Sequence, residues 1–342
     1  MTVFVDFTHL HRPITGLERI ALELFSRSAL APLETIHVTA ASIAGMASKQ
    51  WLGLPWTALT NPGSVVLCPG FPPSIALQMA CRRVIPYVHD LFAIERPQIL
   101  DRAALFYTRP SLARLLRKQE VFLANSEKTR AELMTRAQKP ARVELYRPRI
   151  RNIFDLHPGP SPPPRPILRF VALGTVEPRK NYLYAADVIE ALNARGQPAE
   201  LLIIGQAGWG RDRQALSGRR QVKLCGYLTD SEIRQAVQES DALISTALDE
   251  GLGLPLLELQ YAGLPTVAVD IPIFRETLRR WAVYVPPDDA CAAADAILQN
   301  FGSDGWRAAG RIAANRILEA YNRAADQDRE TVIALIQDLE RA

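Results

Sequence analysis

The sequence has only four cysteines, and their positions exclude several kinds of site. They stand far apart, so none of the short spacings that bind zinc or support redox chemistry is present. No other group of metal ligands stands out along the chain. We therefore expect isolated, mainly buried thiols in a reducing compartment and no bound metal. The cysteines are Cys68, Cys81, Cys225 and Cys291.

Long apolar runs and a strong net charge are also missing. No window contains the roughly 20 uninterrupted apolar residues that span a bilayer, and residues 1–7 lack the basic-then-apolar layout of a signal peptide. The net charge of +4 is too small to indicate a nucleic-acid partner, but it is compatible with acidic substrates or an anionic membrane surface. We expect a cytoplasmic protein that does not bind nucleic acid.

The sequence does contain short apolar, β-rich runs that alternate with longer helical stretches. Near-continuous apolar strands in such an alternation are typical of parallel sheets covered on both faces. The length allows two domains, each with its own core. The expected strands are 2–6, 35–41, 64–68, 84–89, 121–124 and 142–145 in the first half, and 168–174, 200–205, 221–225, 242–245, 265–269 and 282–285 in the second.

One proline-rich segment, 157–166, divides these two sets of strands. Such a composition forms neither a helix nor a central strand, so we interpret it as a semi-rigid linker between domains. The sequence therefore predicts an α/β protein of two Rossmann-like domains, 1–156 and 167–322. Apolar residues at helical spacing predict a closing helix over 323–342 that buries one face.

The most informative segment lies at 245–265, where a glycine-rich turn joins an apolar strand to a helix. Gly251 and Gly253 lie at this junction, and Pro255 suits the first helical turn because the proline nitrogen has no hydrogen to donate. Exposed backbone amides at a helix N-terminus favour an anion or a set of hydroxyls. Because Glu250 and Glu258 are expected near this same helix N-terminus, the segment indicates a polar binding site. The alternative is an ordinary charge preference of helix N-termini.

Two adjacent cations, Arg179 and Lys180, follow the first strand of the second half. At the carboxyl end of a strand they could hold a diphosphate, the arginine as a bidentate fork and the lysine as a point charge. Without a metal, the same charges would stabilise a departing diphosphate. The alternative for two arbitrary basic residues is a solvated surface pair.

The segment 245–265 resembles the glutamate–seven residues–glutamate motif of the group 1 (family 4) nucleotide-sugar glycosyltransferases. Leu252 stands where the typical motif has phenylalanine. Residues 171–181 resemble the family's diphosphate-binding turn, and the segments 201–210 and 222–230 follow in the family's order. The resemblance implies a GT-B fold, in which two Rossmann-like domains face each other across a cleft and the C-terminal helix packs back on the N-terminal domain.

The resemblance also implies roles for individual residues. Glu250 would hold hydroxyls of the donor sugar and contribute to catalysis together with Arg179 and Lys180, while Glu258 would accept from the ribose hydroxyls. The loop after Gly226 would face the nucleobase. The implied donor-binding residues are Gly16, Gly205, Gly226, Tyr227, Leu228, Gly251, Leu252, Gly253, Leu254 and Glu258.

In the N-terminal half the candidates follow strand ends. His89 and Asp90 end an expected strand, and they resemble the family's His-Asp pair on the acceptor side, with the histidine near the transferred sugar. Gly16 precedes an apolar helix, where the missing side chain would let a phosphate approach; a simple helix-entry turn explains it equally well. Ser126 would contact donor or acceptor, or cap a helix.

Two further features have ordinary explanations. Asp326 and Asp328 match a metal-binding aspartate pair of another transferase class, but residues two apart on a helix face different directions, so we discount them. Arg114, Arg117 and Lys118 lie beside Leu112, Leu115 and Leu116 at helical spacing. That helix would lie on an anionic bilayer, or it would be solvated with its leucines in the core.

By resemblance, the expected reaction is a retaining transfer that needs no metal or cofactor. The co-substrate would be a nucleotide-diphosphate sugar, with GDP-mannose as the expected donor, and the acceptor would be a saccharide or lipid-linked saccharide in surface polysaccharide or lipopolysaccharide synthesis. Peripheral contact with the inner face of the cell membrane is part of this expectation. The alternatives are a nucleotide-sugar epimerase or phosphorylase on the same scaffold, and a non-catalytic sugar-binding protein.

Overall fold

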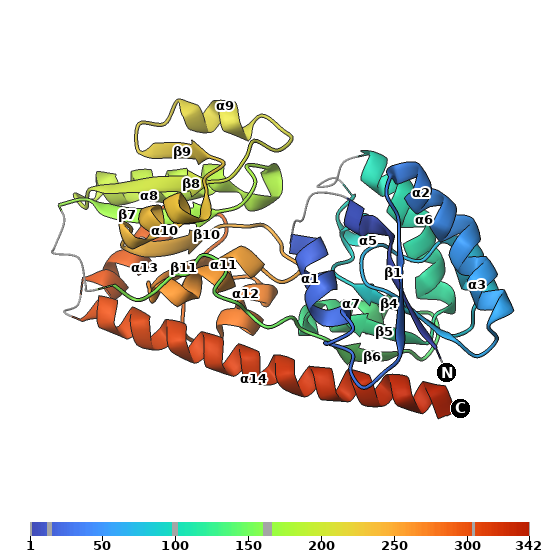
Figure 1. Cartoon of the computed structure of the whole chain (residues 1–342). Coiled ribbons are helices and arrows are strands. Elements are labelled where there is room, and N and C mark those ends of the chain that lie inside the picture. Colours follow the sequence, from blue (N-terminus) through green and yellow to red (C-terminus); the bar gives the residue numbers. More distant parts are fainter. Residues whose placement is uncertain (1, 12–15, 98–101, 160–165, 303–304, 342) are drawn as a thin grey trace. The chain divides into compact units, whose positions relative to one another are not determined.

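A computed structural model of the chain describes residues 2–11, 16–97, 102–159, 166–302 and 305–341. The chain divides into two compact units (Figure 1). The first unit comprises residues 1–149 together with 323–342, and the second comprises residues 150–322. Among the described residues, no helix has the length and hydropathy needed to cross a bilayer.

The first unit is built on a six-stranded sheet in the order β2-β1-β3-β4-β5-β6, and every strand pair in it is parallel. The strands are β1 (Val3–Phe7), β2 (Thr35–Thr39), β3 (Val65–Cys68), β4 (Val84–Val88), β5 (Val121–Ala124) and β6 (Arg142–Leu145). The helices are η1 (Thr8–His11), α1 (Gly16–Phe25), α2 (Ile43–Ser48), the π-helix η2 (Lys49–Gly53), α3 (Leu54–Thr60), α4 (Ile75–Ala80), α5 (Phe92–Glu95), α6 (Arg102–Lys118) and α7 (Glu127–Arg136).

The second unit also contains a six-stranded parallel sheet, in the order β12-β11-β10-β7-β8-β9. Its strands are β7 (Leu168–Leu173), β8 (Ala199–Ile204), β9 (Val222–Gly226), β10 (Ala242–Ser245), β11 (Thr266–Val269) and β12 (Val283–Val285). Its helices are η4 (Pro178–Lys180), α8 (Tyr182–Ala194), α9 (Asp212–Ser217), α10 (Asp230–Gln238), α11 (Leu254–Glu258), η5 (Leu259–Ala262), α12 (Pro272–Leu278), α13 (Ala290–Phe301) and the start of α14 (Trp306–Arg341).

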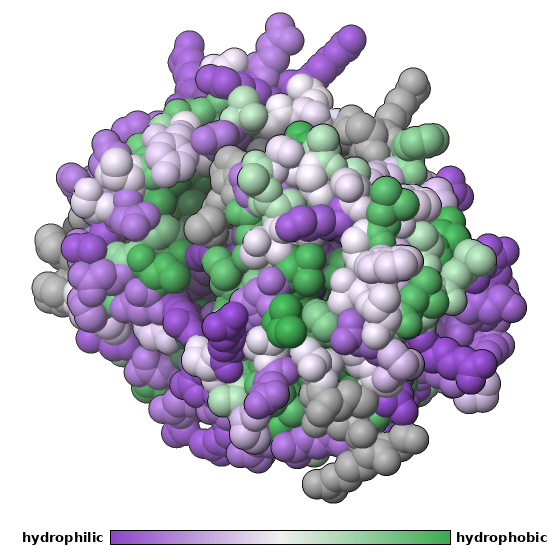
Figure 2. Space-filling model, turned by 45° about the vertical axis from the view of Figure 1, so that its right-hand side comes forward, coloured by the Kyte–Doolittle hydropathy of each residue, from purple (hydrophilic) through white to green (hydrophobic). Residues whose placement is uncertain are grey.

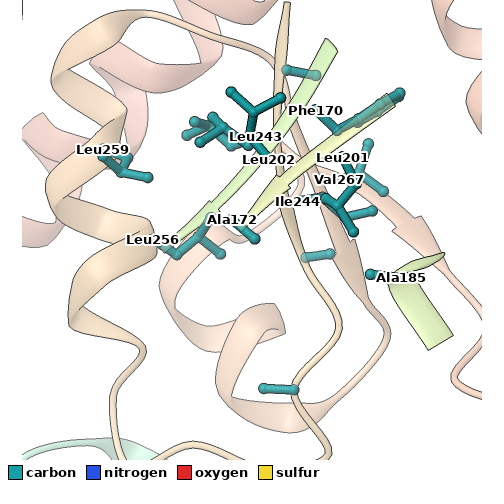
Figure 3. Close-up of a cluster of buried hydrophobic side chains, with 14 of the residues drawn as sticks. Phe170, Ala172, Ala185, Leu201, Leu202, Leu243, Ile244, Leu256, Leu259 and Val267 are labelled. Atoms are coloured by element: carbon teal, nitrogen blue, oxygen red, sulfur yellow. The ribbon is translucent and has the colours of Figure 1, made fainter. Parts of the chain in front are cut away.

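The expectation of two Rossmann-like α/β domains is confirmed. Each expected strand is present within two residues of its predicted bounds. The second sheet has the dinucleotide-fold order, in which the third, second and first strands are followed by the fourth, fifth and sixth. Its core explains why the strands are apolar throughout, since both faces of the sheet are buried: Leu202 and Leu243 lie on one face, and Phe170 and Leu201 lie on the other (Figure 3).

The boundary between the units falls at residues 149 and 150, before the proline-rich segment that we expected to separate the domains. The reason is packing: Ile150, Phe154 and Leu156 belong to the core of the second unit. The carbonyl oxygen of Ile150 also accepts a hydrogen bond from Tyr261 Oη at 2.8 Å. Residues 160–165 of the expected linker lie outside the described residues.

The C-terminal segment is the end of one long helix. Helix α14 covers Trp306–Arg341, and its part from Arg323 onward belongs to the first unit, as expected of the closing helix. Asp328 holds it there by accepting from Arg147 Nε at 2.6 Å and Nη2 at 2.9 Å. Asp326 pairs with Arg149, so both aspartates have arginine partners within the first unit.

Candidate functional site

The second sheet has its topological switch point between β7 and β10, which are neighbours although two strands separate them in the sequence. In open α/β sheets the loops leaving the carboxyl ends of such strands diverge and leave room for a ligand. Here the two loops are joined by hydrogen bonds. Leu248 N donates to Arg179 O at 2.9 Å, and Thr246 Oγ1 donates to Asn181 O at 2.9 Å. The loop after β7 and the loop after β10 therefore form one structural unit.

These two loops bring the predicted charged residues together. Arg179 Nη1 donates to Glu250 Oε2 at 2.6 Å, and Lys180 Nζ donates to Glu250 Oε1 at 2.5 Å. Arg179 also donates through Nη2 to Glu177 Oε1 at 2.8 Å. Glu250 is only 7% exposed. We refer to Glu177, Arg179, Lys180 and Glu250 as the charge cluster.

The cations decide the ionisation of Glu250. Burial alone would disfavour the carboxylate, but Lys180 and Arg179 outweigh it through their charges and hydrogen bonds and hold the pKa of Glu250 below its ordinary value. In the same way, burial opposes the charge of Arg179, yet Glu250 and Glu177 raise its pKa. Glu250 and Arg179 are therefore both ionised at neutral pH, so this pair has fixed charges before any ligand binds.

Glycines let the loops approach closely enough to form this site. Gly205 directly follows β8 and has φ +155°, and a Cβ atom there would lie 2.0 Å from Gly174 O. No side chain fits such a gap, so Gly205 is explained by the contact between the ends of β7 and β8. Gly253 begins α11 with φ +77°, a left-handed conformation that glycine adopts without a steric penalty.

A small pocket opens beside the charge cluster. Its lining combines the ammonium of Lys180 and the carboxylate of Glu250 with the backbone of Gly253 and the apolar side chains of α11. Tyr182 also lines it and donates through its hydroxyl to Gly174 O at 3.3 Å. The sequence analysis did not select Tyr182 or Glu177, although both stand within three residues of Arg179 and proximity to the motif could have indicated them. The complete lining is Leu173, Lys180, Tyr182, Ile244, Ser245, Glu250, Gly253, Pro255, Leu256 and Leu259.

The other predicted donor-binding residues of the second unit, apart from Gly253, do not line this pocket. Glu258 is the last residue of α11, is 5% exposed and does not line the pocket. Leu252 is buried, Leu254 is half-buried at the start of α11, and Gly251 is half-buried. On the neighbouring strands, Gly205 N donates to Gly226 O at 2.9 Å. In the loop that follows, Tyr227 is 76% exposed and Leu228 is half-buried, so this loop offers an accessible ring.

In the first unit His89 and Asp90 follow the carboxyl end of β4, and each has a local partner. His89 follows β4, and its Nε2 donates to Pro69 O at 2.8 Å, which leaves Nδ1 unprotonated in the neutral ring. Burial lowers the pKa of His89 despite that hydrogen bond, so the ring is neutral at pH 7. Asp90 accepts from Phe92 N at 3.1 Å, and Gly16 begins α1 with open space where a Cβ would be.

Ser126 takes the helix-capping role that the sequence left open. It is completely buried, and its Oγ accepts from Thr129 N at 3.2 Å at the start of α7. The structure also shows where the leucines of α6 lie: Leu112, Leu115 and Leu116 are buried in the core. Of the two interpretations of this basic helix, the one with its leucines in the core is correct.

Further polar residues gather at the switch point of the first sheet, between β1 and β3. Asp6 accepts from Thr8 N at 3.0 Å and from Gln50 Nε2 at 3.3 Å, and burial raises its pKa even though these hydrogen bonds favour the anion. His9 is buried directly after β1, and a Cβ on Gly70 would come within 2.6 Å of its ring. The sequence analysis missed His9, although it follows a strand end in the same way as His89.

The described residues include no group of three or more histidines, cysteines, aspartates or glutamates that could hold a metal ion. The charge cluster instead provides two cations within hydrogen-bonding distance of one buried carboxylate. Such an arrangement can bind an anion through the cations and a hydroxyl through the carboxylate. Both functions would be needed by a site that holds a sugar attached to a phosphate.

The chain is similar to known glycosyltransferases in sequence and in fold. The family model described as "Glycosyl transferases group 1" matches residues 167–302, the part of the chain that contains the charge cluster. A serotype-specific mannosyltransferase WbdA of Escherichia coli is 33% identical over 136 residues, which are 37% of this chain and 17% of that protein. The O-antigen chain mannosyltransferase B of Escherichia coli is 24% identical over 252 residues, 69% of this chain and 65% of that protein.

Among solved structures, HepE of Anabaena in complex with UDP superposes with a TM-score of 0.68 at 16% identity and covers 97% of this chain and 99% of that one. The fold is thus that of the GT-B glycosyltransferases. The segment that contains the charge cluster at the switch point of the second sheet, residues 167–302, is therefore similar to the glycosyltransferases of group 1.

Proposed function

We propose that the protein transfers a sugar from a nucleotide-diphosphate donor to a saccharide acceptor. The observation that carries this proposal is the position of Arg179 and Lys180, both bonded to the buried Glu250 beside a pocket at the switch point. The chain spans 17% of the length of the first mannosyltransferase named above and 65% of the second, so the similarity alone does not define the reaction. The chemistry of the site supports the proposed sugar transfer.

The charge cluster fits a departing diphosphate. Lys180 has three donors, of which Glu250 accepts one, and the guanidinium of Arg179 has the planar fork that matches phosphate oxygens. In the half-buried site such charges act in a medium of low dielectric constant and need little reorganisation as negative charge develops on the leaving oxygen. We propose that a bound donor inserts its diphosphate beside these cations.

Glu250 would then have two roles. It keeps the two cations in place before the donor arrives, and its oxygens accept hydrogen bonds from sugar hydroxyls once phosphate oxygens share the cations. Because the pKa of Glu250 is lowered, the residue remains an acceptor and does not donate a proton at neutral pH. Its proposed function is therefore to orient the sugar, while proton transfer from the acceptor hydroxyl goes to the leaving diphosphate.

Such assistance by the leaving group on the face that it leaves would retain the anomeric configuration. It needs no protein nucleophile, and the two cations provide the charge stabilisation that a metal would give in other sites. We therefore propose a retaining, metal-independent transfer. Bound donor would also be protected from hydrolysis if water is excluded from the pocket.

We propose mannose from GDP-mannose as the transferred group. The support is that the relatives named above are mannosyltransferases, one of them named for the O-antigen chain. The acceptor would be a saccharide or a lipid-linked saccharide of a surface polysaccharide or lipopolysaccharide. Glu258 would accept from the ribose hydroxyls, and the exposed Tyr227 with Leu228 would contact the base. For His89 we keep the role that the resemblance implies, a contact with the transferred sugar.

A thermal-shift screen against UDP, GDP, ADP and dTDP sugars tests the donor, and calorimetry measures its affinity. We expect GDP-mannose to raise the melting temperature most. Turnover with an oligomannose acceptor is then followed with and without a chelator, and NMR of the product gives the anomeric configuration. Epimerised sugar from the donor alone, inverted product, or donor binding without any turnover would each contradict the proposal.

A further inference from the structure

Exposed apolar side chains occur in both units. In the first unit, Trp56 and Leu59 are exposed on α3, while Leu54 of the same helix is buried. On the face of the molecule seen in Figure 2, hydrophobic side chains are mixed with hydrophilic ones, as is normal at a protein surface. In the second unit, Ile312 is 58% exposed and borders a cavity. This apolar side chain is therefore part of a site with a defined shape.

The cavity lies at the amino-terminal edge of the second sheet. Thr266 and Val283, the first residues of β11 and β12, line it. Because the strands of this sheet run parallel, the cavity and the charge cluster lie at opposite edges. Its volume of about 480 Å³ is typical of sites that bind small molecules. The described lining is Pro265, Thr266, Arg280, Trp281, Ala282, Val283, Asn300, Phe301, Gly305, Trp306, Ala309, Gly310, Ile312 and Ala313.

Small residues at the start of α14 keep this space open. Ala309 and Ala313 line the cavity, and because they are four residues apart they share one face of the helix. Gly310 lets the helix approach the sheet, since a Cβ atom there would lie 2.4 Å from Pro265 Cγ. Longer side chains in place of the two alanines would occupy the cavity.

Aromatic rings form much of the wall. Phe301 and Trp306 stack with ring centroids 4.3 Å apart, and Trp281 is held by a tight turn in which its backbone nitrogen donates to Leu278 O at 3.0 Å. In that turn Arg279 has φ +52° and ψ −128°, a conformation that favours glycine. Backbone in such sparsely populated regions often occurs at ligand sites. The turn thus gives Trp281 and the next-door Arg280 fixed positions beside the cavity.

The polar groups of the wall are mainly hydrogen-bond donors. The described lining contains one cation, Arg280, and no aspartate or glutamate. The guanidinium carbon of Arg280 lies 4.8 Å from the centroid of the Trp281 ring. Asn300 is fixed by donating from Nδ2 to Ala296 O at 2.8 Å. The cavity therefore combines apolar walls with a guanidinium and an amide.

We propose that this cavity is a saccharide-binding site, separate from the transfer site, that holds a segment of the acceptor chain. A pyranose ring has C–H groups on its faces and hydroxyls at its edge. Apolar walls bury the C–H groups, while the guanidinium and the amide bond to the hydroxyls. A nucleotide fits less well, because its phosphates would meet a single arginine here but two cations in the charge cluster.

The proposal rests on the proposed function for the identity of the saccharide. A chain that is bound at a second site keeps its free end near the enzyme and raises the effective concentration of that end. The cavity would therefore favour long acceptors over short ones. It would take no part in the chemical step, because the charge cluster lies at the other edge of the sheet.

Fluorine NMR of the full chain labelled with 5-fluorotryptophan gives a local test. The chain has five tryptophans, and the variant Trp281→Phe assigns the signal of Trp281. We expect mannotetraose to shift this signal in a saturable manner. In Ala309→Phe the added ring occupies the cavity, so the Kd from this titration should rise at least about tenfold. The matched control Ala308→Phe adds the same ring at an exposed neighbour outside the lining and should bind as wild type does.

The role of Arg280 is tested with Arg280→Ala, which should raise the Kd about fivefold or more because hydrogen bonds from a charged donor are lost. The control Arg220→Ala removes an exposed arginine outside the lining. In the transfer assay, Ala309→Phe should raise the KM of a long oligomannose about threefold or more relative to the KM of mannobiose. A merely structural effect of the substitution would change both KM values alike.

Three results would overturn the proposal: a Trp281 signal that mannotetraose does not shift, an equal Kd in folded Ala309→Phe and wild type, and a dimer in light scattering that Ala309→Phe dissociates. Circular dichroism checks the folding of each variant. Turnover of GDP-mannose with mannobiose reports on the transfer reaction separately. Turnover without a Trp281 response would reject only the saccharide site, whereas a Trp281 response without turnover would reject only the proposed transfer.

Discussion

Arg179 and Glu250 are 71 residues apart in the sequence, and Arg179 Nη1 lies 2.6 Å from Glu250 Oε2. This ion pair joins the loops that leave β7 and β10 and fixes two cations at the switch point of the second sheet. A ligand that binds the guanidinium of Arg179 must therefore displace the carboxylate of Glu250 or share the guanidinium with it. The expected behaviour of variants in this cluster follows from that competition.

Arg179→Ala should lower turnover on the order of a hundredfold, because it removes a donor to the leaving diphosphate. Lys180 remains bonded to Glu250, so the fold should persist. Turnover is measured at saturating donor, and circular dichroism checks folding. The control Arg220→Ala removes an exposed arginine before β9 and should leave turnover unchanged. Wild-type turnover in folded Arg179→Ala would exclude the leaving-group role.

Glu250→Gln should destabilise the protein by about 3 kcal/mol at neutral pH, because it leaves two half-buried cations without their carboxylate. The pKa of Glu250 lies below its ordinary 4.5 in the folded chain. Its contribution is therefore complete above pH 4.5 and is lost as the pH falls through the lower folded value. The difference in unfolding free energy between wild type and Glu250→Gln should shrink below pH 4.5. Urea titrations at several pH values measure it, and a difference that is constant with pH would contradict the assignment.

Gly205→Ala should destabilise the second unit more than Gly196→Ala does. Both glycines have positive φ, but a Cβ at Gly205 meets Gly174 O at 2.0 Å while a Cβ at Gly196 meets nothing within 4 Å. The conformational cost alone is about 1 kcal/mol, and the clash should add roughly 1–3 kcal/mol. Chemical denaturation compares the two variants. Equal destabilisation would show that the loops can separate without cost.

Glu258→Gln should weaken nucleotide binding about 10- to 100-fold, as expected for the loss of hydrogen bonds to a charged acceptor. The substitution keeps the size of this buried side chain, so packing should be preserved. Isothermal calorimetry with GDP measures the affinity, with Glu239→Gln at the end of α10 as a control outside the site. Unchanged affinity would reject the ribose assignment and require another role for this buried acid.

The strands and several segments of the candidate site could be predicted from the sequence. Each of the twelve strands was predicted, because a buried parallel strand is apolar along its whole length and is separated from the next by a helical pattern. The segments around Arg179 and Glu250 were also identified, since glycine and charge at strand ends form a local pattern. These features depend on residues close together in the chain.

Local patterns therefore predicted the order of elements, the two sheets and the residue types at the strand ends. Four features became evident from the folded chain alone: β7 lies beside β10, Glu250 accepts from both cations, Ile150 belongs to the second core, and α3 is apolar on both faces. The physical reason is that neighbours in a sheet and partners in a core are selected by packing between distant segments, whereas sequence periodicity reports only on the faces of a single element.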